Sequence, residues 1–107
     1  MLAANELNAV VSRVVANARQ PAKVIVFGSY ARGVADEDSD LDLLVVEQEL
    51  FDKGKEYLRL KAAVGRIGVG VDLLLMSESE FERRRQVLGT VPYWASQEGR
   101  VLYDATA

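Results

Sequence analysis

The stretch "FGSYARGVADEDSDLDLLVV", residues 27–46, joins two strand-like segments through a glycine-containing turn and an acidic loop. The first segment, KVIVFGS at residues 23–29, is short and rich in β-branched residues. The second, DLDLLVVE at residues 40–47, places Asp40 and Asp42 on one face because side chains alternate along a strand. Carboxylates held beside apolar residues cost free energy unless their charge is compensated. The stretch therefore predicts a sheet with a functional site on it.

The flanking sequence extends this pattern. Apolar residues at helical spacing predict helices over residues 2–19 and 50–64, and Pro21 closes the first of them. A third strand is expected at residues 69–76, which are apolar except for Asp72. The last expected elements are a helix with a capping box at Ser77/Glu80 or Ser79/Glu82, a break or restart of that helix at Pro92, and a short strand at residues 100–104.

Helices thus alternate with strands, which favours an α/β fold, a small mixed sheet flanked by helices. An α+β arrangement stays open because the last elements need not keep a parallel order. A chain of 107 residues is large enough for one core and too small for two, so residues 1–107 are expected to form a single domain.

Composition narrows the possible chemistry. Cysteine and histidine are both absent, which excludes disulfides, imidazole general bases and thiolate or histidine metal sites. Any acid–base or metal chemistry must therefore use carboxylates. The net charge of −3 argues against general binding to a nucleic-acid backbone. No targeting signal or membrane-spanning run is seen, and a cytoplasmic location is expected.

Asp40 and Asp42 are candidate metal ligands. Their like charges repel at this spacing, and a divalent cation relieves the repulsion. Magnesium takes hard oxygen ligands and completes its shell with water and substrate phosphates. Asp72 supplies a third carboxylate if the strands at 40–47 and 69–76 are neighbours. The alternatives are acids that cap loops and, for Asp72, an edge-strand residue facing water.

Gly28 and Ser29 are candidates for binding phosphate. A glycine at a strand end allows close approach to the backbone, and the start of a helix offers N–H donors to an anion. The alternative is a plain strand-to-helix turn in which Ser29 is the N-cap. Arg32 either offers its charge to a phosphate or is solvated, and Gly33 fits a turn.

Together these residues resemble a known family. Gly28-Ser29, ten further residues and then Asp40-Leu41-Asp42 match the Gly-Ser-x10-Asp-x-Asp signature of the DNA polymerase β-like nucleotidyltransferase superfamily, and Asp72 falls where that family places its third carboxylate. The segments GSYARG…SDLDLLV and EGRVLYD are most similar to those of the minimal nucleotidyltransferases, which include the MntA-type antitoxins of HEPN/MNT toxin–antitoxin pairs.

The resemblance implies a polymerase β-like core and a set of roles. Asp40 and Asp42 would hold two Mg²⁺ ions that bridge a nucleoside triphosphate, and Asp72 would ligate one and help to deprotonate the acceptor hydroxyl. Gly28 and Ser29 would hold the β- and γ-phosphates. The implied activity is transfer of AMP from ATP to a hydroxyl of a cognate HEPN ribonuclease toxin, with tyrosine as the expected acceptor.

Two other functions stay open from the sequence. One is a non-catalytic antitoxin that covers its partner's active site, and the other is nucleotidyl transfer to a small molecule such as an aminoglycoside. The basic run Arg83 to Arg85 is interpreted as a solvated helix face, and Trp94 as a core or interface residue rather than a nucleotide-stacking one.

Overall fold

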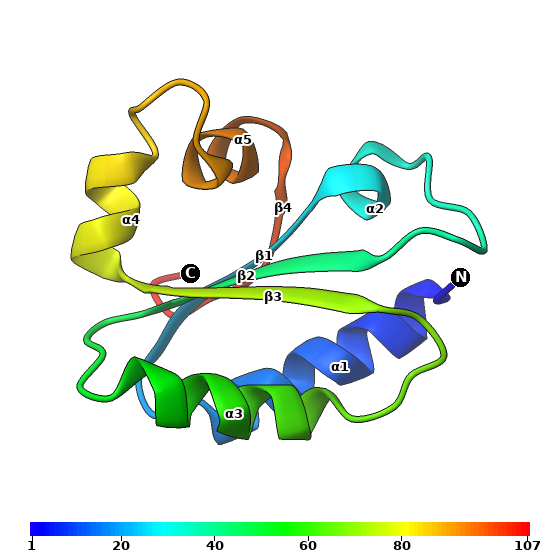
Figure 1. Cartoon of the computed structure of the whole chain (residues 1–107), viewed down its shortest axis with the longest axis horizontal. Coiled ribbons are helices and arrows are strands. Elements are labelled where there is room, and N and C mark those ends of the chain that lie inside the picture. The colour runs from blue at the N-terminus through cyan, green and yellow to red at the C-terminus, as the bar shows by residue number, and fades with distance from the viewer.

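The computed structural model describes all residues, Met1 to Ala107, as four strands and five helices (Figure 1). The helices are α1 (Ala4–Asn17), α2 (Gly28–Arg32), α3 (Lys53–Val64), α4 (Glu78–Arg84) and α5 (Val91–Glu98). The strands are β1 (Pro21–Phe27), β2 (Leu41–Glu47), β3 (Val71–Ser77) and β4 (Arg100–Asp104).

The four strands form one mixed sheet in the order β3-β2-β1-β4. β1 pairs antiparallel with both β2 and β4, whereas β2 and β3 run parallel through the crossover helix α3. The small mixed sheet expected from the sequence is therefore confirmed, with the antiparallel pairs on one side and the parallel pair on the other.

Each face of the sheet carries its own apolar cluster. α1 and α3 cover one face, where Val24, Val26 and Leu43 lie in the larger cluster (Figure 1). α4 and α5 lie across the other face, where Leu44 and Val46 join the smaller cluster. Asp42 shares this second face with Leu44 because side chains two residues apart point the same way.

The element boundaries follow local signals in the sequence. Ser77 caps α4 by accepting a hydrogen bond from the backbone N–H of Glu80 at 3.2 Å, which is one half of the first expected capping box, while the Glu80 carboxylate accepts from Arg84 instead. Pro92 lies in the first turn of α5, so it restarts the helix rather than merely breaking it. The expected helix at 50–64 begins three residues later, at Lys53 behind its N-cap Asp52. No helix has the length and apolarity needed to cross a membrane.

Candidate active site

Asp42 and Asp72 are direct neighbours in the sheet. The parallel register of β2 and β3 sets Asp42 opposite Asp72, and the antiparallel register on its other side sets Asp42 opposite Phe27. Residues paired across a ladder point to the same face, so the two carboxylates emerge side by side. This confirms the expectation that the two strands are neighbours. Asp72 is also exposed on an edge strand, as the alternative interpretation expected, and its role as a metal ligand stays a prediction.

Asp40 lies one residue before β2 rather than in it. At this point Leu41 donates its backbone N–H to the carbonyl of Gly70 at 2.8 Å, which brings Asp40 against the chain entering β3. A Cβ added to Gly70 would lie 2.4 Å from Asp40 Oδ1. Gly70 therefore leaves the space that the Asp40 carboxylate occupies, a role that the sequence reasoning missed.

Gly28 likewise leaves the space that the Asp42 carboxylate occupies. Its φ is +69°, a left-handed conformation that favours glycine, and a Cβ there would lie 2.2 Å from Asp42 Oδ2. The glycine that directly follows β1 thus packs its Cα against the Asp42 carboxylate. This packing is a second reason for a glycine at the turn, beside the access to phosphate that the sequence suggested.

The electrostatics of Asp42 reflect this crowding. Burial, then a hydrogen bond with Asp72 and repulsion from Asp72 and Asp40, raise the pKa of Asp42 to about 6, against a smaller opposing effect of Arg32. A hydrogen bond between two carboxyl groups requires a shared proton. A cation is the natural replacement for that proton, because it neutralises both groups at once.

Ser29 and Arg32 lie on α2, which starts directly at the end of β1. The N-cap of α2 is Phe27, which makes no side-chain cap, so the interpretation of Ser29 as N-cap is wrong. The half-buried Ser29 hydroxyl makes no hydrogen bond within the chain and is available to a ligand. Arg32 is exposed and its guanidinium lies 4.0 Å from the Glu98 carboxylate, a loose surface pair.

A cavity of about 310 Å³ adjoins this turn and is lined by Phe27, Gly28, Arg32, Trp94 and Glu98. Gly28 therefore borders both the cavity and the Asp42 carboxylate. Trp94 is 46% exposed at the cavity wall and meets the ring of Tyr93 edge-on at 5.2 Å, so it is not a core residue. The sequence alone did not connect α5 with the Gly-Ser turn.

The acids fit a divalent cation that keeps few protein ligands. No three acidic side chains stand close enough, as they are placed, to enclose one ion together. Asp42 and Asp72 still provide two adjacent hard oxygen donors on an open face, and Asp40 adds negative potential beside them. Magnesium binds commonly through one or two carboxylates plus water and phosphate oxygens, which matches this donor set.

The basic run expected to be solvated forms ordinary surface ion pairs. Arg84 contacts Glu80 at 3.0 Å and Arg85 contacts Glu82 at 3.3 Å, each within helical reach. Arg85 also lies over the ring of Phe81, with 5.4 Å to the ring centre. These pairs support the interpretation of a solvated helix face.

Two sequence relatives resemble this chain over most of its length. A protein of Methanocaldococcus jannaschii named as a protein adenylyltransferase is 38% identical over 87 residues, which cover 76% of this chain and 77% of the relative. The protein adenylyltransferase MntA of Thermococcus cleftensis is 40% identical over 73 residues, covering 64% of this chain and 69% of the relative.

Solved structures show the same fold at lower identity. A nucleotidyltransferase structure from Sulfolobus solfataricus matches with a TM-score of 0.65 and 19% identity, covering 95% of this chain and 80% of the other. The complex of a tri-AMPylated Shewanella oneidensis HEPN toxin with an MNT antitoxin matches with a TM-score of 0.55 and 18% identity, covering 95% and 72%.

The family model described as a nucleotidyltransferase domain matches residues 7–94, a span that includes the Gly-Ser turn, all three acids and most of the sheet. Taken with the sequence relatives and the mixed sheet that carries the paired carboxylates, this match shows that the chain belongs to the nucleotidyltransferase domain family.

Proposed function

We propose that this chain, as a single domain over residues 1–107, transfers AMP from ATP to a hydroxyl of a HEPN ribonuclease toxin and so acts as its antitoxin. The observation that carries the proposal is the pairing of Asp42 with Asp72 directly beside the Gly28 turn. Two relatives named as protein adenylyltransferases support a protein as the acceptor of AMP. A similar fold in complex with an AMPylated HEPN toxin supports the partner.

The triphosphate is assigned to the Gly28 turn. Gly28 lines the adjoining cavity directly after β1, and the free Ser29 hydroxyl offers a donor to the β- and γ-phosphates. Arg32 brings a positive charge, and only a loose contact with Glu98 holds it. The adjoining cavity of about 310 Å³ lies in the usual size range of small-ligand sites.

The transfer is an in-line substitution at the α-phosphorus. The acceptor oxygen forms a bond to phosphorus while the bond from phosphorus to the bridging oxygen of pyrophosphate breaks, and the hydroxyl loses its proton. Magnesium, held by Asp42 and Asp72 when bound, with the negative charge of Asp40 beside them, would neutralise the charge that develops on the phosphate oxygens. Asp72 is exposed at the sheet edge, where an acceptor on another protein can reach it, and we assign it the proton.

Asparagine variants at the paired acids test this proposal. Asp42→Asn and Asp72→Asn keep the side-chain shape and remove a crowded charge, so both variants should fold at least as well as the wild type. Transfer of labelled AMP to the HEPN partner, measured with ATP and Mg²⁺, should fall at least about 100-fold in each.

Asp38→Asn is the matched control, because Asp38 is exposed in the loop before β2 and its carboxylate makes no hydrogen bond. It should keep transfer within about twofold of the wild type. Retention of full transfer by a folded Asp42→Asn variant would refute the assigned site.

A further inference from the structure

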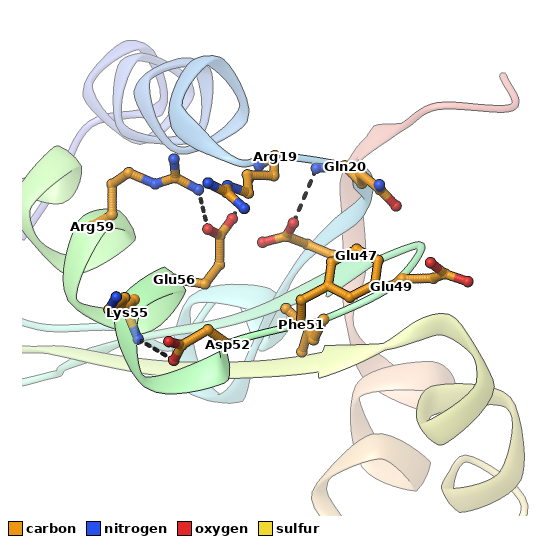
Figure 2. Close-up of a pocket in the computed structure, with 10 residues that line it drawn as sticks. Arg19, Gln20, Glu47, Glu49, Phe51, Asp52, Lys55, Glu56 and Arg59 are labelled. Atoms are coloured by element: carbon orange, nitrogen blue, oxygen red, sulfur yellow. Dashed lines mark hydrogen bonds and ion pairs between the residues drawn. The ribbon is translucent and has the colours of Figure 1, made fainter.

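A second pocket lies at the opposite end of β2 from Asp42 (Figure 2). It is formed by the loop between α1 and β1, the last residue of β2, the loop from β2 to α3, and α3 from Lys55 to Arg59, and its volume is about 410 Å³. None of the residues that line it belongs to the proposed transfer site. The pocket is therefore a separate feature of the fold.

Glu47, the last residue of β2, is the unusual group in this pocket. It is completely buried, with 0% of its surface exposed. Its Oε1 accepts a hydrogen bond from the backbone N–H of Gln20 at 3.0 Å, but its Oε2 is buried and accepts no hydrogen bond from any donor. Buried polar groups in native proteins are nearly always paired, and one left unpaired costs about 1–3 kcal/mol.

The neighbouring carboxylate of Glu56 has no such deficit. Its Oε2 accepts from the backbone N–H of Arg19 at 3.0 Å, and its Oε1 accepts from the guanidinium of Arg59 (Figure 2). Burial alone would raise the pKa of Glu56, but hydrogen bonds from Glu47, Arg19 and Arg59 outweigh it and lower that pKa. Glu56 is therefore the charged, satisfied member of the pair, and Arg59 is already committed to it.

For Glu47 the same kinds of interaction raise the pKa instead of lowering it. Burial, then the hydrogen bond with Glu56, raise the pKa of Glu47 to about 7. Near neutral pH the Glu47 carboxyl thus holds a proton about half of the time, and the protonated carboxyl can donate to Glu56. When the proton leaves, a buried anion with an open acceptor remains at the wall of a cavity.

The surrounding charges favour a cation in place of that proton. The charged groups that line the pocket together with Glu47 are Arg19, Glu49, Asp52, Lys55, Glu56 and Arg59. With Glu47 ionised, the lining holds four acids and three bases and has a net charge of −1. In the view of Figure 2, Glu49 and Phe51 lie on the side of Glu47 away from Arg59. Phe51 is 77% exposed and offers an aromatic face to a cation.

We propose that this pocket binds a cationic N–H donor, an alkylammonium or alkylguanidinium group, which donates to Glu47 Oε2 and displaces its proton. The group belongs either to a small molecule or to a lysine or arginine side chain of another protein. Both sources share the same chemistry: one positive charge, N–H donors and an apolar stem that lies along Phe51.

The binding is linked to protonation with a defined sign. Because binding requires ionised Glu47, affinity increases with pH until the carboxyl is fully ionised. For a pKa of about 7, the ionised fraction rises about tenfold between pH 6 and pH 8, so the dissociation constant should fall about tenfold. At pH 7 each bound cation should release about half a proton.

Calorimetric titration of the full chain with n-butylguanidinium tests the proposal in the absence of ATP. We expect saturable binding, with buffer-dependent heats that report proton release, and no binding of the neutral analogue n-butylurea. Glu47→Gln should abolish binding of the cation. Glu37→Gln removes an exposed acid outside the pocket, so it is the control and should leave binding within about twofold of the wild type.

A capped Gly-Arg-Gly peptide distinguishes the two sources. Tighter binding of the peptide than of n-butylguanidinium assigns the pocket to a protein side chain, whereas weaker binding assigns it to a small cation. Failure of both probes to bind at pH 8, or equal binding by the Glu47→Gln variant, would overturn the proposal. AMP transfer plays no part in these measurements, so their outcome is independent of the proposed function.

Discussion

Replacing Gly28 by alanine should disable transfer through the position of Asp42. The new Cβ would lie 2.2 Å from Asp42 Oδ2, whereas an ordinary contact needs at least 3.4 Å, so the carboxylate must move by more than about 1 Å. A displacement of that size at a reacting centre costs about 100-fold in rate. The left-handed φ of +69° adds a stability cost of about 1–2 kcal/mol. AMP transfer to the HEPN partner and thermal unfolding measure the two effects separately.

Gly33→Ala provides the matched control for this prediction. Gly33 has nearly the same φ, +73°, at the other end of α2, but a Cβ there meets nothing within 4 Å. The two variants should therefore lose similar stability, and only Gly28→Ala should lose transfer. If both variants transfer AMP equally well, within about threefold, the packing of Gly28 against Asp42 does not position the carboxylate and the reasoning fails.

Two further predictions concern the other close contacts. Gly70→Ala places a Cβ 2.4 Å from Asp40 Oδ1 and should weaken Mg²⁺-dependent transfer at least about tenfold. Gly68→Ala is the control, because its Cβ meets nothing within 4 Å, and it should not weaken transfer. Equal activities of the two variants would contradict the role given to Asp40. For Glu47, the folded-state pKa of about 7 lies above the ordinary 4.5, so its contribution to stability is complete below pH 4.5 and is lost as pH rises to 7. In urea unfolding, the free energy of unfolding of the wild type should fall by up to about 3 kcal/mol more than that of Glu47→Gln between pH 5 and pH 8. Parallel pH dependences of the two proteins would exclude the raised pKa of Glu47.

The sequence predicted the parts of the site that depend on the alternation of side chains along a single strand. The alternation of Asp42, Leu44 and Val46 fixes the face on which the acid emerges, and the apolar run around Asp72 predicts the strand β3 but not its pairing with β2. Both signals are local, and the sheet register then brings the acids together.

Features that depend on packing between distant segments were not visible in the sequence. Glu47 reads as the polar end of a strand, and its burial arises because the α1–β1 loop and α3 close over it. In the sequence, Gly70 looks like an ordinary loop glycine, and only the structure shows that it packs against Asp40. In both cases the partner is more than 25 residues away or on another strand, so no periodicity or motif reports the contact.

The most direct test of the central claim is the fate of the two ends of ATP. The protein is incubated with Mg²⁺ and its HEPN partner, using ATP labelled at either the α- or the γ-phosphate. Nucleotidyl transfer predicts that the partner retains the α-label and gains the mass of AMP on a hydroxyl side chain, while the γ-label leaves as pyrophosphate. Retention of the γ-label, or no label on a folded partner, would contradict the account.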